Sequence, residues 1–285
     1  MCRFLAYKGE PILLADLITK PDNSLITQSF KAKERKEPLN GDGFGLGWYS
    51  PEIDPSPCIF TSVTPAWANR NLHRIADKII SPCFFAHVRA ATDGLAVNEI
   101  NCHPFQYGVL QWMHNGSIAG FDKIKRVLRR SLSDEIYAWL QGTTDSEHAF
   151  AVFLDALEKR DSNYSEKELI QAMRDMIQRI NSWCSELRIE STSLCNFAVS
   201  DGKSVIVSRY SSAKDKKPAS LYYSIGSKFS CVDGVCLMTP DEKKTEAVLI
   251  ASEPLTEDRK NWIEVGVNKL LVVDDSLNAR QEEIF

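Results

Sequence analysis

Residues 121–132, which read FDKIKRVLRRSL, mark the point where the hydrophobic pattern of this chain changes its period. Apolar residues at Ile124, Val127, Leu128 and Leu132 recur at the spacing of one helical face. Before this stretch the apolar runs are short or alternating and are broken by glycine and proline, which predicts strands and loops. The stretch therefore predicts the start of an α region after a β region.

Further helices are predicted on the C-terminal side of this boundary. Ser133 is a predicted N-cap for a helix over 134–141, a second helix begins at Asp145, and a long one follows Ser165. Beyond residue 191 the strand pattern returns. Hairpin turns are predicted at Asp201-Gly202 and Asp233-Gly234, and strands over 247–251 and 262–273.

The clearest strands on the N-terminal side are predicted over 83–90 and 107–113. The order is thus strands, helices, then strands, without regular βαβ alternation, which favours an α+β layered fold over a doubly wound one. We find no internal repeat and no linker. The sequence predicts one compact domain over 1–285, with two sheets and flanking helices.

Composition narrows the class of protein. The chain has 285 residues, is 44% apolar and has a net charge of −4, with no run of five like charges. Neither nucleic acid nor an anionic membrane is favoured as a partner. No apolar run approaches the roughly 18 to 20 residues needed to span a bilayer.

The cysteines and histidines indicate a cytoplasmic protein without a metal centre. Eight cysteines occur without any C-x-x-C spacing, and the five histidines show no ligand pairing. The cysteine flanks are mostly apolar, which is typical of reduced core thiols in a reducing compartment, and no signal peptide is recognised. We therefore expect no cofactor and a cytoplasmic location.

Cys2 is a candidate nucleophile because removal of Met1 would give it a free α-amine. A thiol with an ordinary pKa of about 8.5 beside an amine of about 8 can exchange a proton at little cost. Retention of Met1 would instead turn this amine into an amide without useful basicity. The alternative is a small buried apolar residue, which is the commoner role of an isolated cysteine.

The glycine-rich segment 41–48, GDGFGLGW, does not match a nucleotide-binding loop. No offset gives G-x-G-x-x-G or G-x-x-x-x-G-K, and no helix is predicted after it. Glycine at alternate positions predicts a strand whose backbone closely approaches a second sheet or a ligand.

Polar residues that could carry chemistry follow the predicted strands. Arg89 offers a planar fork of donors for a carboxylate, although a salt bridge at a strand end is the simpler alternative. Asn115 and the Gly116 N–H are convergent donors for an oxyanion, although an Asn-Gly pair also forms type I′ turns. Asp145 places a carboxylate at a predicted helix start, where helix capping is the favoured role. A thiol protease using Cys102 beside its sequence neighbour is disfavoured, because such neighbours rarely face each other.

Together, Cys2, the glycine-rich strand and five polar segments resemble the class II glutamine amidotransferases of the N-terminal-nucleophile hydrolase superfamily, including their stand-alone members. The segments are HVRAAT at 87–92, NCHPF at 101–105, HNGSI at 114–118, TDSE at 144–147 and ASEPL at 251–255. The resemblance covers nearly the whole chain. It implies a four-layer αββα sandwich.

The resemblance also implies roles for individual residues. Cys2 would attack the γ-carboxamide of glutamine, form a γ-glutamyl thioester and release ammonia, with Asn115 and Gly116 as the oxyanion hole. The substrate would be held by four further residues, of which Arg89 and Thr92 would hold its α-carboxylate, Asp145 its α-ammonium, and His103 would shape the pocket floor.

Two departures from the family pattern keep alternatives open. Asp93 stands where members fused to synthases often have histidine, and no ammonia-accepting domain follows. The ammonia would therefore pass to a separate acceptor subunit or be released. Other γ-glutamyl amides, including γ-glutamyl peptides and thiol compounds, are alternative substrates, and a non-catalytic regulatory or scaffold relative is the alternative from a different class.

Overall fold

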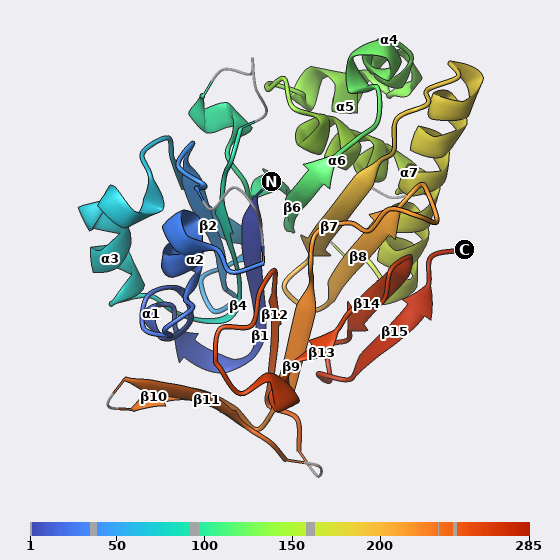
Figure 1. The fold of residues 1–285 in the computed structure, drawn as a ribbon. Coiled ribbons are helices and arrows are strands. Elements are labelled where there is room, and N and C mark those ends of the chain that lie inside the picture. Colours follow the sequence, from blue (N-terminus) through green and yellow to red (C-terminus); the bar gives the residue numbers. More distant parts are fainter. Residues whose placement is uncertain (1, 35–38, 92–96, 158–162, 233, 242–243) are drawn as a thin grey trace.

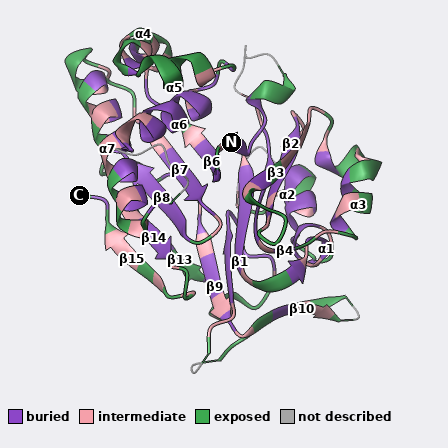
Figure 2. Ribbon diagram, turned by 180° about the vertical axis from the view of Figure 1, so that it is seen from behind, coloured by how far each residue is buried: buried purple, intermediate pink, exposed green. Residues whose placement is uncertain are grey.

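The computed structural model describes residues 2–34, 39–91, 97–157, 163–232, 234–241 and 244–285. Two antiparallel sheets face each other, and each carries helices on its outer face (Figure 1). The result is a four-layer αββα arrangement, as the resemblance implied. Strands in the middle of both sheets are largely buried, whereas the helices expose their outward sides (Figure 2).

The first sheet has seven strands in the order β13-β9-β12-β1-β4-β2-β3. Its strands are β1 (Arg3–Leu13), β2 (Phe44–Ser50), β3 (Asp54–Ser62), β4 (Ile80–Val88), β9 (Tyr222–Gly226), β12 (Ala247–Ala251) and β13 (Ile263–Glu264). β1 lies in the middle, with Leu5 opposite Ala251 on one side and Ala86 on the other. The N-terminal strand is therefore held between β4, from the first third of the chain, and β12, from its C-terminal part.

The second sheet has six strands in the order β15-β14-β8-β7-β6-β5. These are β5 (Phe105–Tyr107), β6 (Leu110–Ser117), β7 (Leu194–Ser200), β8 (Val205–Ser211), β14 (Lys269–Val273) and β15 (Ala279–Glu283). The two-stranded hairpin of β10 (Lys228–Val232) and β11 (Val235–Thr239) projects separately.

Three short helices cover the first sheet, and four helices, including the longest, cover the second. The short ones are α1 (Ala15–Ile18), α2 (Leu25–Lys31) and α3 (Arg70–Ala76), and the others are α4 (Phe121–Ser131), α5 (Asp134–Trp139), α6 (Asp145–Ala156) and α7 (Glu166–Glu186). Single 3-10 turns are η1 (Ala66–Ala68), η2 (Glu99–Asn101) and η3 (Arg259–Asn261). Three apolar clusters fill the spaces between these four layers.

The helices predicted from residue 121 onward are confirmed, as is the strand of the glycine-rich segment. At Gly45 of this strand, a Cβ would lie 2.1 Å from the carbonyl oxygen of His103, so glycine permits the close approach. The single strand predicted over 107–113 is wrong, because Gly108 adopts a φ of +54° and a turn separates β5 from β6. Helices α1, α2 and α3 were not predicted.

The expectation that all cysteines are reduced is corrected by a disulfide between Cys231 and Cys236. The two residues are direct partners across the β10–β11 hairpin, which places their side chains on the same face. The predicted turn between these strands falls partly outside the described residues, because Asp233 is not described.

Candidate active site

The Cys2 thiol lies on the side of the first sheet that faces the second sheet, next to the segment that follows β4 and includes Arg89. Phe4 of β1 packs in the inter-sheet core, and alternation along the chain puts Cys2 on the same face. Its Sγ lies 3.4 Å from the Ala90 nitrogen, which donates to it, and 3.6 Å from the Ala90 carbonyl oxygen. The fold thus brings Cys2 against Ala90, the sequence neighbour of Arg89, across a separation of 88 positions.

A buried ion pair fixes the backbone of Cys2. The Arg3 Nε donates to Glu253 Oε1 at 2.8 Å, and Arg3 Nη1 donates to the Cys2 carbonyl at 3.0 Å. Both side chains are 1% exposed. The other carboxylate oxygen, Oε2, accepts from the Lys33 backbone at 2.8 Å. Our sequence reasoning missed Arg3, whose only signal is its position directly after the candidate nucleophile.

The Arg89 guanidinium is buried but makes little use of its donors. Its Nη1 donates to the Asp42 carbonyl at 3.4 Å, and no carboxylate in the described ranges lies within ion-pairing distance. The Asp42 side chain instead accepts from the Ala91 nitrogen at 2.8 Å. The salt-bridge alternative for Arg89 is therefore wrong within the described residues, and its fork is available to a ligand carboxylate. Thr92 lies outside the described residues.

Asn115 presents a buried amide that lacks a hydrogen-bond partner. Met113, two residues earlier on β6, packs in the inter-sheet core, so alternation directs Asn115 to the same space as Cys2. Its Nδ2 and Oδ1 both lack partners among the described residues. An orphaned buried polar group costs roughly 1–3 kcal/mol, so it points to an external partner.

The backbone geometry at position 116 requires a glycine. Its φ is +147°, and a Cβ there would lie 1.9 Å from the Leu194 carbonyl oxygen. Both Asn115 and Gly116 belong to β6, so the type I′ turn considered for this pair is wrong.

Two imidazoles stack between the sheets, and one of them, on β4, contacts the backbone of β6. The rings of His87 and His103 stack with centroids 4.1 Å apart, and His87 Nε2 donates to the His114 carbonyl at 3.1 Å. Burial lowers the pKa of His103 well below its usual range, and the nearby charges of His87, His114 and Arg89 act in the same direction. The His103 ring is therefore neutral, and neither of its nitrogens has a described partner.

Cys102 is not an activated thiol. Its Sγ donates to the carbonyls of Ser62 and Asn98, at 3.7 and 3.6 Å. Burial raises its pKa to about 11, against the opposing effect of Arg89. A thiol of this kind is protonated at neutral pH, which argues against the thiol-protease alternative.

Asp145 begins α6 but does not cap it. The cap is Thr144, whose hydroxyl accepts from the Glu147 nitrogen at 3.3 Å. Asp145 Oδ2 instead accepts from the Ile118 nitrogen at 2.9 Å, just beyond the end of β6. This contact holds the carboxylate beside Ile118, which follows Gly116 by two positions in the sequence. Asp145 therefore lies near the candidate oxyanion donors.

Neither a metal centre nor a membrane span is found in the part of the chain that the structure describes. Its His, Cys, Asp and Glu side chains form no group of three suited to a metal ion. None of its helices is both long and apolar enough to cross a bilayer.

A family model described as class-II glutamine amidotransferases matches residues 12–282. The chain belongs to the class-II glutamine amidotransferases. The probable glutamine amidotransferase DUG3 of Saccharomyces cerevisiae is 42% identical over 292 residues, which cover 96% of this chain and 82% of the relative.

A second relative shares a shorter segment with this class-II amidotransferase. The gamma-glutamyl-hercynylcysteine sulfoxide hydrolase of Mycobacterium tuberculosis is 32% identical over 119 residues, which cover 41% of this chain and 50% of the relative. It is named for hydrolysis of a γ-glutamyl compound. The family and these relatives support hydrolysis of glutamine or a γ-glutamyl amide.

Solved structures of class-II amidotransferases share the fold. A class-II glutamine aminotransferase domain protein from Silicibacter pomeroyi superposes with a TM-score of 0.67 at 24% identity, covering 99% of each chain. The glutamine phosphoribosylpyrophosphate amidotransferase of Bacillus subtilis gives 0.60 at 16% identity, covering 100% of this chain and 49% of the other. These likenesses confirm the N-terminal-nucleophile hydrolase fold.

The family match of this amidotransferase begins at residue 12, so Cys2 and Arg3 precede the matched segment. The candidacy of Cys2 as a nucleophile therefore rests on the geometry described above.

Proposed function

We propose that this protein hydrolyses the γ-carboxamide of glutamine with Cys2 as an N-terminal nucleophile, after removal of Met1. The observation that carries the proposal is that the Cys2 thiol contacts the backbone beside a buried arginine. The thiol contacts the residue that follows Arg89, and the guanidinium is buried without a described carboxylate. A nucleophile beside an unsatisfied carboxylate receptor suits an amino-acid substrate.

In the proposed reaction the free α-amine of Cys2 accepts the thiol proton as Sγ attacks the γ-carbonyl carbon. The Asn115 amide and the Gly116 N–H stabilise the oxyanion of the tetrahedral intermediate. The C–N bond then breaks, ammonia leaves with the proton from the amine, and a γ-glutamyl thioester remains on Cys2. Water hydrolyses the thioester to glutamate and restores the thiol.

Substrate recognition is assigned to the two charged ends of glutamine. Arg89, with Thr92, holds the α-carboxylate through its planar fork, and Asp145 holds the α-ammonium. The neutral His103 ring forms part of the pocket floor. The buried pair of Arg3 and Glu253 positions the Cys2 backbone without contacting substrate.

A second candidate is hydrolysis of another γ-glutamyl amide, such as a γ-glutamyl peptide or thiol compound. The similarity to the mycobacterial γ-glutamyl hydrolase over 119 residues favours it. Arg89 and Asp145 would recognise the same γ-glutamyl group, and only the leaving-group side would differ.

We infer that residues 1–285 form one domain of this kind, acting in the cytoplasm on a small molecule. Ammonia released from glutamine would go to a separate acceptor subunit or to solvent, whereas a γ-glutamyl peptide would release an amine and need no acceptor.

The test compares Cys2→Ala with Cys58→Ala, which removes an exposed thiol on β3. Glutamate release is measured from glutamine and from a γ-glutamyl dipeptide. We expect Cys2→Ala to abolish both activities at unchanged melting temperature, and Cys58→Ala to retain them. Retained hydrolysis in Cys2→Ala would refute the mechanism, and the better wild-type substrate would decide between the two candidates.

A further inference from the structure

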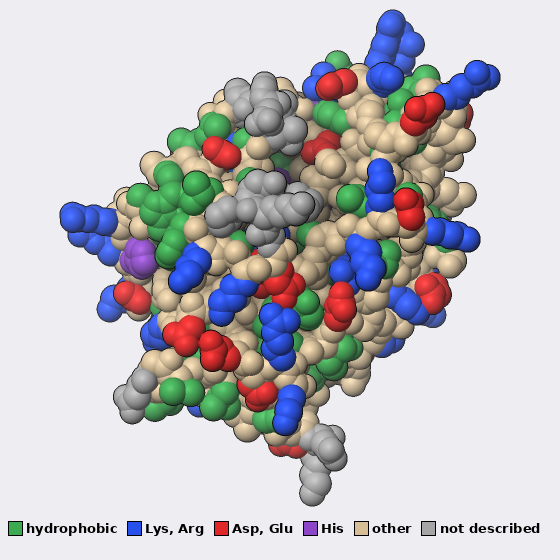
Figure 3. All heavy atoms as spheres, in the orientation of Figure 1, with side chains coloured by type: hydrophobic (Ala, Val, Ile, Leu, Met, Phe, Trp, Pro, Cys, Tyr) green, Lys and Arg blue, Asp and Glu red, His purple; other side chains and the backbone are tan. Residues whose placement is uncertain are grey.

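A pocket of about 650 Å³ lies over α4 and α5 and contains none of the residues assigned to the active site. It is lined by Asp122, Lys125, Arg126, Arg129, Arg130, Leu132, Asp134 and Tyr137. Cations therefore outnumber carboxylates by two to one in its lining. Figure 3 shows Lys and Arg side chains gathered at the top of the molecule, over α4. In a chain with a net charge of −4, this is a local excess of positive charge.

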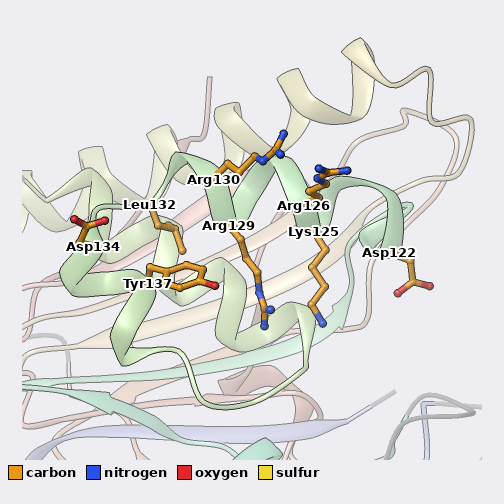
Figure 4. A pocket seen from close by; sticks show the side chains of 8 residues that line it. All are labelled: Asp122, Lys125, Arg126, Arg129, Arg130, Leu132, Asp134 and Tyr137. Carbon is orange, nitrogen blue, oxygen red and sulfur yellow. The ribbon is translucent and has the colours of Figure 1, made fainter.

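The four cations of the pocket form no direct ion pair with a described carboxylate, although the charges of Asp122 and Glu147 attract Lys125 from a greater distance. None of Lys125, Arg126, Arg129 and Arg130 forms an ion pair with any carboxylate that the structure describes. Lys125 and Arg129 are one helical turn apart, and Figure 4 shows both side chains extending in the same direction, with the Tyr137 hydroxyl on that side. Like charges in this arrangement repel each other. Burial, and then the charge of Arg129, lower the pKa of Lys125.

Contacts to neighbouring residues hold these two cations in place. Arg129 Nε donates to His148 Nε2 at 2.9 Å, which leaves the terminal nitrogens of Arg129 without a described partner. Lys125 Nζ lies 3.5 Å from the Thr143 carbonyl and 5.4 Å from the centre of the Phe121 ring. The pair is therefore positioned before any ligand arrives, which reduces the entropy lost on binding.

The chemistry of the pocket suits a phosphate ester. A guanidinium with free terminal nitrogens beside an ammonium matches the oxygens and the double charge of a phosphate group. Tyr137 is 55% exposed and offers an apolar ring at the edge of the site. The volume is within the range of about 300–1,000 Å³ that is typical of small-molecule pockets. We propose that this pocket binds a small organic phosphate, with its phosphate between Lys125 and Arg129 and its organic part against Tyr137.

Calorimetry with the full-length protein at low salt tests the proposal, using ADP, inorganic phosphate and adenosine as ligands. We expect ADP to bind more tightly than phosphate, adenosine to bind undetectably, and the ADP affinity to fall as salt is added. Lys125→Gln and Arg129→Gln should each weaken ADP binding about tenfold or more. The matched control is Lys123→Gln, which removes the same charge from an exposed residue of α4 outside the pocket lining and should change affinity less than about twofold. Tyr137→Ser should weaken ADP binding but not phosphate binding.

Three results would overturn this site. The first is absence of ADP and phosphate binding to the wild-type protein up to about 10 mM, where even weak complexes are detected. The second is an equal loss in Lys123→Gln and Arg129→Gln, which would mean attraction to the whole helix. The third is tighter binding of hexaglutamate than of ADP, which would assign the pocket to an acidic segment of a protein. Melting temperatures of all variants separate loss of binding from loss of folding. The binding assay needs no turnover, so its outcome is independent of the amidohydrolase proposal.

Discussion

At the scale of single residues, the site combines groups that stability alone does not explain. Asn115 is buried and both of its amide atoms lack a partner among the described residues, and Arg89 is buried without a described carboxylate. Each arrangement costs free energy in the empty protein. A substrate that supplies an oxyanion and a carboxylate would satisfy both groups, which is why we assign them to binding and catalysis.

Replacing Asn115 tests the proposed oxyanion hole. Asn115→Ala removes one donor to the developing negative charge, so we expect kcat for glutamine hydrolysis to fall about 10²–10³-fold with little change in KM. The fold should persist, because no described hydrogen bond is lost with this amide. A variant with unchanged kcat would remove Asn115 from the mechanism.

The proposed site residues were predicted through residue type and motif order, but their anchors could not be predicted. Cys2, Arg89, Asn115 and Asp145 each carry a chemical group with a recognisable use. Arg3 and Glu253 are separated by 250 positions, and neither has a local pattern that indicates its partner. Pairing across such a distance is decided by the fold.

At the scale of elements, an ion pair holds the start of β1 against the loop that follows β12. Glu253 is fully buried, pairs with Arg3 and also accepts backbone N–H groups from Lys33 and Glu34. Glu34 Oε1 in turn accepts from Arg259 at 3.1 Å. The segment that follows α2, the start of β1 and the segment that follows β12 therefore meet at Glu253.

Glu253→Gln tests the contribution of this junction. The substitution keeps the size but leaves the Arg3 charge buried and uncompensated, so we expect the free energy of unfolding to fall by about 3–5 kcal/mol in urea titration. The matched control is Glu166→Gln, which breaks the more exposed pair with Arg280 and should cost no more than about 1 kcal/mol. Equal effects of the two substitutions would show that the buried junction is not structural.

Elements with a long periodic pattern or a clear N-cap signal could be predicted from sequence, and most short ones without such a signal could not. Helices α4 and α7 show the helical period over three turns or more and were predicted close to their observed bounds. Helices α1, α2 and α3 have four to seven residues, too few turns for a period to appear. Strand β15 reads ARQEE, so it has no apolar alternation to detect.

At the scale of the whole molecule, buried neutral histidines couple stability to pH. Burial is the main cause that lowers the pKa values of His87, His103, His114 and His148, to about 3 for His87 and about 4 for His148. In the unfolded chain their pKa values return to about 6.5. Below that pH the unfolded chain binds more protons than the folded one, so stability decreases as pH falls.

We expect the free energy of unfolding to drop by roughly 0.8 kcal/mol for each of His87, His103 and His148 between pH 7.5 and 6, or about 2.4 kcal/mol for the three, with a further decrease from His114. Burial raises the pKa values of Asp201 and Glu147 and gives the opposite sign at lower pH, so the test stays above pH 6. Urea titration at the two pH values measures the difference. Exposed His73→Gln should leave the difference unchanged, whereas His148→Gln should reduce it. Equal stability of the wild-type protein at pH 6 and 7.5 would contradict the prediction.

The central claim, that Cys2 is an N-terminal nucleophile, is tested most directly by intact-mass spectrometry. The purified protein is measured before and after treatment with a diazoketone analogue of glutamine, and the adduct is located by peptide mapping. We predict a mass lacking methionine and a single adduct on Cys2, prevented by excess glutamine. Retention of Met1 without an adduct, or an adduct on another cysteine, would contradict the account.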